Sequence, residues 1–318
     1  MRALITGVAG FAGGHLAEHL ASTTDWEVWG NVRDEPDLRS VVPGVRAVVS
    51  DLRDPRAAFD LIDQVQPGYV FHLAAQPFVP QSWADPWDTF ETNLRSQFNL
   101  FEALLKRGVP ARTLVVGSNE EYGLVSPDSL PLRENSPLRP DSPYGVSKVT
   151  QDYLGLQYFL SHKLPVVRVR PFNHIGPRQS EKFVAPAFAR QIASIEAGLA
   201  PPVIKVGNLT AQRDFTDVRD MMRGYRLAIE KGEPGEVYNI GSGTPRSVQQ
   251  LLDILLGLSA VPIRVEQDPD RMRPSDNPIA YCDARKFAAR TGWQPIIPFA
   301  QTLRDVLDDW RQRVRRSP

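Results

Sequence analysis

A glycine-rich segment directly behind the first strand-like run constrains the fold of this chain more than any other feature. The apolar run 2–6 leads into TGVAGFAG, and a helical pattern begins near Gly13. Glycines let a backbone turn tightly and approach a ligand, while the free amides and dipole of the following helix favour negative charge. A plain strand–helix turn is the alternative, but the position at the start of a βαβ unit favours a dinucleotide pyrophosphate. The predicted contacts in this turn are Gly7, Gly10, Phe11, Ala12 and Gly13.

Strand-like and helical patterns alternate through the first half of the chain. Strands are predicted at 2–6, 27–31, 45–50, 68–73, 112–117 and 165–170, with helices at 13–21, 57–65 and 90–106 between them. This alternation predicts an α/β fold with a doubly wound parallel sheet and a smaller, mixed α/β C-terminal lobe. We expect 1–171 to form the sheet domain, with 214–245 returning to it, and 172–213 and 246–318 to form the lobe.

Composition excludes several classes of partner. The 318 residues contain 37 Lys+Arg and 37 Asp+Glu, and this zero net charge argues against nucleic acid or an anionic membrane as a partner. No apolar run approaches the roughly 20 residues of a membrane helix, and Met1 leads directly into a strand without a signal peptide. A single cysteine, Cys282, is typical of a reducing compartment, so we expect a cytoplasmic protein. The histidines and this cysteine lack metal-ligand spacing, and no metal is expected.

The end of the second predicted strand bears on which dinucleotide binds. An acidic residue there accepts hydrogen bonds from the ribose of NAD, but this chain has Asn31 at that position. Arg33 can pair with a 2′-phosphate, which favours NADP(H) over NAD(H); a solvated Arg33, with Asp34 in the acidic role, is the alternative. Residues after later strands are expected near the adenine and ribose: Asp51, Leu52, Leu73, Ala74 and Ala75.

Residues suited to proton transfer follow in the next part of the chain. In SPYGVSK, Ser142 is a plausible helix cap, so Tyr144 and Lys148 share one helix face. A nearby ammonium lowers the pKa of a phenol, which predicts that Tyr144 exchanges protons near neutral pH. Ser118 ends a predicted strand and is suited to polarise a carbonyl. Two carboxylates follow it at 120 and 121, and one of them, with Glu120 the candidate, is suited to act as a base.

TGxxGxxG, a serine at a strand end and YxxxK together resemble the extended short-chain dehydrogenase/reductases, over essentially the whole chain. The resemblance implies a Rossmann domain, a lobe that binds a nucleotide sugar, and a catalytic set made of Ser118, Tyr144 and Lys148. It also implies that Tyr144 and Lys148 contact the cofactor. A homodimer is implied too, formed through the helices 90–106 and 144–161.

Motifs in the second half look like the branch of this family that acts on GDP-sugars. They are NHIGPRQ, KVGNL, RDFTD and RPSD, beginning at Asn173, Lys205, Arg213 and Arg273. Arginines and lysines there are suited to grip a diphosphate, although some of them can instead pair with neighbouring aspartates. The expected substrate contacts are Asn173, Arg178, Val184, Lys205, Arg213, Arg273 and Asp276.

Two activities of this branch compete. The run FNHIGPRQS and a short segment from Arg33 to Gly44 look closest to the reductases, which implies NADPH-dependent reduction of the C4 ketone of GDP-4-dehydro-6-deoxy-D-mannose to a GDP-6-deoxyhexose of the GDP-D-rhamnose type. Glu120 is retained from the dehydratases, so GDP-mannose 4,6-dehydratase is the alternative, followed by another nucleotide-sugar 4-epimerase or dehydratase. A non-catalytic NADP sensor is disfavoured, because such proteins usually lack the Tyr/Lys pair.

Overall fold

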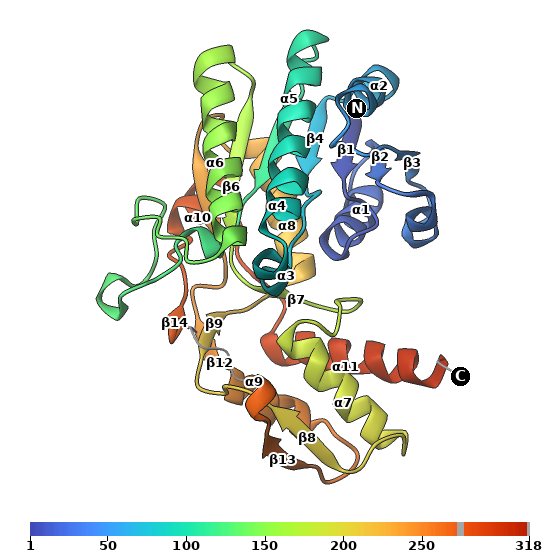
Figure 1. Cartoon of the computed structure of the whole chain (residues 1–318), viewed down its shortest axis with the longest axis vertical. Helices are drawn as coiled ribbons and strands as arrows, with labels where there is room; N and C mark the ends of the chain where they lie inside the picture. The colour runs from blue at the N-terminus through green and yellow to red at the C-terminus, as the bar shows by residue number, and fades with distance from the viewer. Residues whose placement is uncertain (272–276, 317–318) are drawn as a thin grey trace.

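A seven-stranded, fully parallel sheet forms the upper body of the computed structural model, which describes residues 1–271 and 277–316 (Figure 1). Its strand order is β11-β6-β5-β4-β1-β2-β3. The strands are β1 (Arg2–Thr6), β2 (Glu27–Val32), β3 (Arg46–Val49), β4 (Tyr69–His72), β5 (Arg112–Val116), β6 (Val166–Pro171) and β11 (Val237–Ile240). The order reverses between β1 and β4, and such a switch point is where doubly wound folds bind ligands. The predicted α/β fold class is confirmed.

Helices cover both faces of this sheet. One hydrophobic cluster lies under α1 (Phe11–Thr23) and α8 (Val218–Lys231), which pack against each other. A second cluster lies under α2 (Pro55–Val65), α5 (Ser96–Lys106) and α6 (Pro143–His162). Burial on both faces explains why the strands read as continuous apolar runs.

The lobe lies below the sheet in Figure 1 and has its own hydrophobic cluster. Its helices are α7 (Val184–Glu196), α9 (Val248–Gly257) and α11 (Phe299–Arg316), packed beside the pair β8 (Val203–Val206) and β13 (Arg264–Gln267). Shorter strands form two small sheets: β7 (His174–Ile175) with β10 (Thr216–Asp217), and β12 (Pro245–Ser247) with β9 (Gln212–Asp214) and β14 (Ile279–Ala280).

The chain crosses between the two parts more often than the sequence predicted. As expected, α8 covers the sheet and β11 joins it at the edge beside β6. The helix α10 (Arg285–Thr291) also packs against α8 and β11, and Phe287 and Trp293 are buried in the cluster under α1. Residues 285–293 therefore belong with the sheet domain, whereas we expected all of 246–318 in the lobe. The sequence analysis did not recognise that Phe287 and Trp293 pack against residues that are far away in the sequence.

The long helix predicted at 90–106 is interrupted. After α3 (Val79–Ala84) and α4 (Pro86–Phe90), residues Glu91–Arg95 form a π-helical turn before α5 begins. In this turn Asn93 is fully buried, and its side chain accepts from the Gln76 N–H (2.7 Å) and donates to the Ser147 hydroxyl (2.9 Å) in α6. Such turns are frequently found at functional sites. Single-turn 3-10 helices occupy Asn119–Glu121, Pro127–Ser129 and Pro269–Arg271, and a longer one spans Glu35–Ser40.

Candidate active site

A cleft of about 1190 Å³ runs along the carboxyl edge of the sheet and is lined by residues of both parts of the chain. The sheet domain contributes the glycine-rich turn and the ends of β2, β4 and β5. The lobe contributes residues around β7, the start of α7 and the segment around β9. A ligand in the cleft therefore contacts both parts of the chain.

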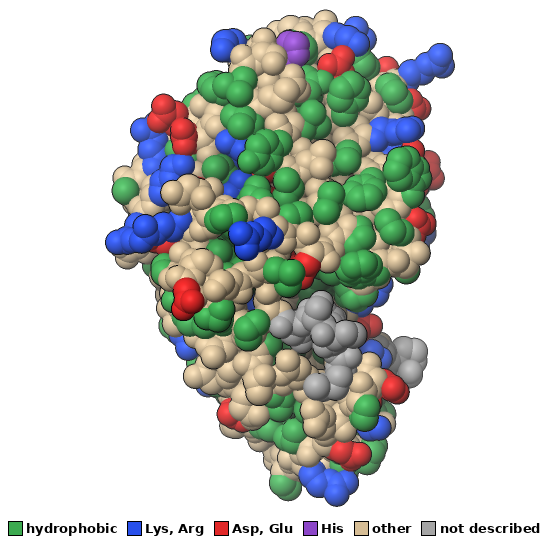
Figure 2. Space-filling view, turned by 60° about the vertical axis from the view of Figure 1, so that its left-hand side comes forward, with side chains coloured by type: hydrophobic (Ala, Val, Ile, Leu, Met, Phe, Trp, Pro, Cys, Tyr) green, Lys and Arg blue, Asp and Glu red, His purple; other side chains and the backbone are tan. Residues whose placement is uncertain are grey.

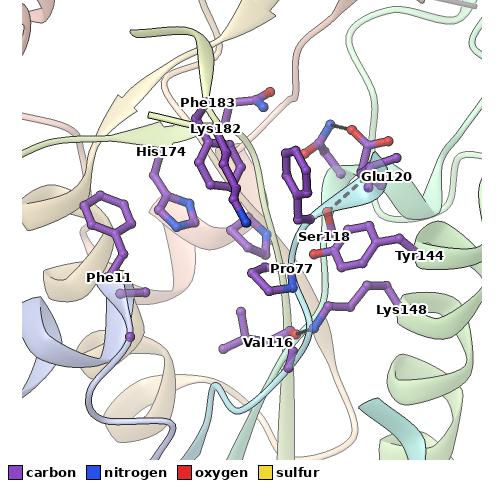
Figure 3. A pocket seen from close by; sticks show the side chains of 18 of the residues that line it. Phe11, Pro77, Val116, Ser118, Glu120, Tyr144, Lys148, His174, Lys182 and Phe183 are labelled. Carbon is purple, nitrogen blue, oxygen red and sulfur yellow. Dashed lines mark hydrogen bonds between the residues drawn. The ribbon is translucent and has the colours of Figure 1, made fainter. Parts of the chain in front are cut away.

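Ser118 enters the cleft from the end of β5. It caps the turn Asn119–Glu121, where its hydroxyl accepts from the Glu120 N–H (3.2 Å) and its own N–H donates to Glu121 (2.8 Å). The two bonds form a reciprocal capping box, which fixes the turn. The carboxylate of Glu120 also lines the cleft, beside Ser118 (Figure 3).

Tyr144 and Lys148 reach the same region from α6. Ser142 caps this helix by accepting from the Gly145 N–H (3.0 Å), and the predicted spacing places both side chains on the cleft side. In Figure 3 the Tyr144 hydroxyl points toward Ser118, while the Lys148 amine points toward the end of β5. That amine donates to the Val116 carbonyl (3.0 Å) and to the Gln151 side chain (2.9 Å). The three predicted catalytic residues thus converge in one place.

The electrostatics of this group differ from the expectation. Burial raises the pKa of Tyr144, a hydrogen bond with Ser118 opposes the rise, and Glu120 and Glu121 add to it. Burial also lowers the pKa of Lys148 to about 8. The expected lowering of the Tyr144 pKa by Lys148 is absent among the groups that the structure describes, because the amine bonds to Val116 and Gln151 and lies 5.9 Å from the centre of the phenol ring.

The glycine-rich turn has the shape that a pyrophosphate needs. Gly7 has a φ of +70°. A Cβ at Gly13 would lie 2.3 Å from the Gly7 carbonyl oxygen, so any side chain at position 13 would collide with the backbone of the turn. Gly10 caps α1 with no side-chain hydrogen bond from any described residue, which leaves helix amides to face an anion. All five residues predicted for this turn line the cleft.

Asn31 shapes this turn from within. It is 3% exposed, its Oδ1 accepts from the Gly7 N–H (3.0 Å), and its Nδ2 donates to the Ser50 carbonyl (2.6 Å). Both polar ends of the side chain are therefore used inside the chain. Asn31 also lines the cleft, so its place beside the cofactor stays a prediction.

Charged pairs line the far end of the cleft, where the adenosine is expected. Arg33 pairs with Asp34 (2.9 Å), and Arg53 makes two bonds to Asp51 (3.1 and 2.7 Å), which hold the pKa of Asp51 below its usual value. Arg33 is exposed, as a partner for a 2′-phosphate must be. The cleft is also lined there by Leu52, Leu73, Ala74 and Ala75.

On the lobe side, three of the predicted substrate residues line the cleft: Asn173, Val184 and Arg213. Arg213 is held by hydrogen bonds from its guanidinium to the carbonyls of Gln212 (2.9 Å) and Asn277 (2.7 Å). The buried Oδ1 of Asn173 lacks a hydrogen-bond partner within residues 1–271 and 277–316, as expected for an atom that binds a ligand.

Two predicted diphosphate contacts lie elsewhere. Arg178 has a φ of +70°, and this turn directs its guanidinium onto Glu18 in α1 with two bonds of 2.7 Å, in a separate depression behind the cleft. Lys205 is exposed on β8, where its backbone pairs with the side chain of Gln191. Neither residue is among those that line the cleft, and their contact with the substrate stays a prediction. Arg273 and Asp276 lie outside the described residues.

Comparison with known proteins agrees with this arrangement. The family model for GDP-mannose 4,6 dehydratase matches residues 4–306. The chain belongs to the GDP-mannose 4,6-dehydratase family. A GDP-6-deoxy-D-mannose reductase from Pseudomonas aeruginosa is 36% identical over 99% of both chains, and a dTDP-glucose 4,6-dehydratase from Streptomyces antibioticus is 31% identical over 98% of this chain and 92% of that protein. Among solved structures, RMD from Pseudomonas aeruginosa complexed with NADPH has a TM-score of 0.88 at 35% identity, covering 98% of this chain and 99% of that one.

In this member of the GDP-mannose 4,6-dehydratase family, several cleft residues lie just outside the recognised motifs. Lys182 and Phe183 line the cleft from the loop before α7, and they meet Phe78 across it. The Lys182 amine lies 5.4 Å from the centre of the Phe78 ring, and the two phenylalanine rings meet edge to face at 6.0 Å. Their position directly before the predicted Val184 was the available signal.

Charged residues elsewhere in this family member also lie at the cleft. Arg271 lines the cleft outside any recognised motif, and Glu121, one of the two carboxylates predicted after Ser118, is buried beneath the cleft. Within the described ranges, no helix is long and apolar enough to cross a membrane, and no group of three or more His, Cys, Asp or Glu residues is placed to hold a metal ion.

Proposed function

We propose that this protein reduces the C4 ketone of GDP-4-dehydro-6-deoxy-D-mannose with NADPH, forming a GDP-6-deoxyhexose of the GDP-D-rhamnose type. The observation that carries the proposal is the convergence of Ser118, Tyr144 and Lys148 between the glycine-rich turn and the lobe. The name of the 36% identical relative, a GDP-6-deoxy-D-mannose reductase, supports the choice of substrate.

Different residues along the cleft bind the cofactor and the substrate. NADPH, when bound, supplies a hydride. The turn from Gly7 to Gly13 holds the pyrophosphate, and Arg33 pairs with the 2′-phosphate. On the lobe side, Arg213 holds the sugar diphosphate, Lys182 and Arg271 add positive charge around it, and the Asn173 Oδ1 accepts from a hydroxyl of the substrate.

Proton transfer falls to the residues at the end of β5 and on α6. The Ser118 hydroxyl donates a hydrogen bond to the C4 oxygen, and the Tyr144 phenol protonates that oxygen as negative charge develops. Lys148 holds the nicotinamide ribose. Burial raises the pKa of Tyr144, so the phenol is protonated at neutral pH and meets the developing alkoxide as a donor.

The test is nicotinamide absorbance with NADPH and freshly prepared GDP-4-dehydro-6-deoxy-D-mannose. We expect a fall in absorbance that depends on the ketosugar, and product NMR then gives the configuration at C4. A flat trace from folded protein that binds NADPH would contradict the proposal.

GDP-mannose 4,6-dehydratase is the second candidate, and Glu120 favours it. This carboxylate lines the cleft next to Ser118, where a base is needed to remove a proton beside the C4 ketone. Incubation with GDP-mannose distinguishes the two activities, since a dehydratase recycles its nicotinamide and forms the ketosugar without net consumption of NADPH. Another nucleotide-sugar 4-epimerase or dehydratase is tested in the same way with UDP- and dTDP-sugars.

We propose that the protein works as a cytoplasmic homodimer through α5 and α6. The face that carries α6, in the upper part of Figure 2, presents many hydrophobic side chains. Phe98 in α5 is 48% exposed, and Tyr153 and Leu160 in α6 are 54% and 57% exposed. Exposed apolar side chains that cluster on one face are typical of an interface. Light scattering tests this: we expect twice the mass of the chain, and Leu160→Glu should shift the protein to a monomer.

A further inference from the structure

A buried carboxyl group lies directly behind Ser118, outside the cleft. The side chain of Glu121 is fully buried, its Oε1 accepts from the Ser118 N–H at 2.8 Å, and its Oε2 lies 2.8 Å from Nε of Arg170. The proposed chemistry does not use this group directly, because the carboxyl faces away from the substrate side of the turn.

Glu121 leaves little freedom to the backbone that presents Ser118. A Cβ at Gly117 would lie 2.0 Å from Glu121 Oε1, so the carboxyl occupies the space beneath that residue. The Ser118 hydroxyl in turn accepts from the Glu120 N–H, which closes the capping box. The positions of the Ser118 hydroxyl and of the next residue therefore depend on where this carboxyl is held.

An ion cluster holds the carboxyl in place. Arg170 in β6 contacts Glu121 and also donates to Asp152 in α6 (2.8 and 2.5 Å), and Asp152 pairs with Arg168. All four side chains are at least nine-tenths buried. Because α6 also carries Tyr144 and Lys148, the cluster links the Ser118 turn to the helix of the other two catalytic residues.

Removing the four ionisable side chains of this cluster from water costs free energy. Burial and the nearby Asp152 raise the pKa of Glu121 well above its ordinary value, and buried polar clusters are often matched or exceeded in stability by well-packed apolar side chains, so stability alone is a weak reason for this carboxyl. Hydrogen-bond geometry explains the Glu121 carboxyl better, since a carboxyl can hold one amide at a fixed place and an apolar side chain cannot.

We propose that Glu121 is a positioning residue, which fixes Ser118 relative to Tyr144 and Lys148 so that the ketone oxygen meets both hydroxyl groups. This inference rests on the proposed reduction. It predicts that changes at Glu121 lower kcat and leave KM for the ketosugar nearly unchanged, because the residue touches neither substrate nor cofactor.

Two substitutions at Glu121 distinguish a role in positioning Ser118 from a role in packing the core. Glu121→Leu removes the acceptor, and we expect kcat to fall on the order of 10- to 100-fold, because small misplacements of reacting groups have effects of that size. Glu121→Gln keeps an oxygen for the Ser118 amide, and we expect it to restore kcat to within about fivefold of the wild type. If Glu121→Leu alone does not fold, Glu121→Leu combined with Arg170→Leu removes one charge of each sign and leaves the Arg168–Asp152 pair intact.

Asp220→Asn is the matched control. It removes a carboxylate that is also buried and also accepts from backbone amides, those of Ile296 and Ile297 (2.8 Å each), but lies in α8 outside both the cleft and the cluster. We expect its melting temperature to fall with that of the Glu121 variants while kcat stays within about threefold of the wild type.

A second readout does not depend on the substrate. The sequence contains two Gly-Ser pairs, Gly117-Ser118 and Gly241-Ser242, so labelling glycine carbonyls with ¹³C and serine amides with ¹⁵N selects two NMR signals. The Ser242 amide is bonded to the buried Asp214 (2.8 Å) and serves as an internal reference. We expect hydrogen exchange of the Ser118 amide to accelerate by at least about tenfold in Glu121→Leu, while Ser242 does not change.

The outcomes distinguish this inference from the proposed function. Equal losses of kcat in Glu121→Leu and Asp220→Asn, or unchanged exchange at Ser118, would overturn the positioning role. A wild-type protein that consumes no NADPH with the ketosugar would refute the proposed reduction. In that case the exchange of the Ser118 amide still decides whether Glu121 holds the turn.

Discussion

The two walls of the cleft are built in different ways. On the wall of the sheet domain, Lys148 is 5% exposed and Asn31 is 3% exposed, and their polar atoms are held by hydrogen bonds inside the chain. On the lobe wall, Lys182, Phe183 and Arg271 are exposed. Reacting groups must be held to within about half an ångström before a substrate arrives, whereas recognition of a ligand tolerates side chains that settle on binding. The comparison predicts that changes on the first wall affect kcat and changes on the second affect KM.

The largest effect is expected at Tyr144. Tyr144→Phe removes the proposed proton donor and leaves the ring in place, so kcat should fall by roughly 10²- to 10⁴-fold. NADPH affinity, measured by fluorescence titration, should remain close to that of the wild type. A variant that retains near wild-type turnover would show that this wall does not carry the proton transfer.

Arg213 tests the opposite wall. Arg213→Gln removes a positive charge facing the proposed diphosphate, and charge-assisted hydrogen bonds contribute about 1.5–3 kcal/mol, which corresponds to roughly a 10- to 100-fold rise in KM. Steady-state kinetics should show kcat within a few-fold of the wild type. A fall in kcat at unchanged KM would mean that the two walls do not divide the work as proposed.

The pH dependence sharpens the first half of the comparison. Lys148 has a pKa of about 8 in the chain without ligands, so its ammonium form is lost as the pH rises above 8, and kcat/KM should fall by up to tenfold per pH unit beyond that point.

Unfolding does not explain such a loss. The pKa of Lys148 lies below the ordinary 10.5 in the folded chain, so between these values the unfolded chain binds more protons and this group makes the free energy of unfolding rise with pH. Melting temperatures measured from pH 8 to pH 10 provide the check. A rate that stays flat to pH 10 would contradict the role of the ammonium.

The smallest effect is expected at Arg178. Its pair with Glu18 is partly exposed and lies behind the cleft, so Arg178→Ala should leave KM for the ketosugar unchanged. Stability should change by no more than about 1 kcal/mol, because exposed ion pairs contribute little. Chemical denaturation and kinetics on one preparation test both statements. A tenfold rise in KM would restore Arg178 to the substrate site.

Sequence reasoning succeeded where function depends on neighbours in the chain. The glycine-rich turn, Ser118 at a strand end, and Tyr144 with Lys148 one helical turn apart are local patterns, and the structure places all of them in the cleft. It did not foresee that the Arg178 guanidinium pairs with Glu18, a residue 160 positions away in the chain.

Residues whose roles depend on distant partners were also beyond its reach. Asn31 reaches Ser50, and Glu121 reaches Arg170, across strands that are neighbours only after folding. Gln151 is the exception, since it stands one turn after Lys148 on the same helix face and was open to recognition.

The late return of the chain to the sheet also governs how the protein is made. The first 171 residues contain six of the seven strands, but α8 and β11 are synthesised only after the first part of the lobe, and Phe287 and Trp293 only after most of it. At 5–20 residues per second, translation from 172 to 293 takes on the order of ten seconds. During that time one face of the nascent sheet lacks its cover, so the ribosome-bound chain is a client for chaperones, and truncation before Trp293 should yield an insoluble product.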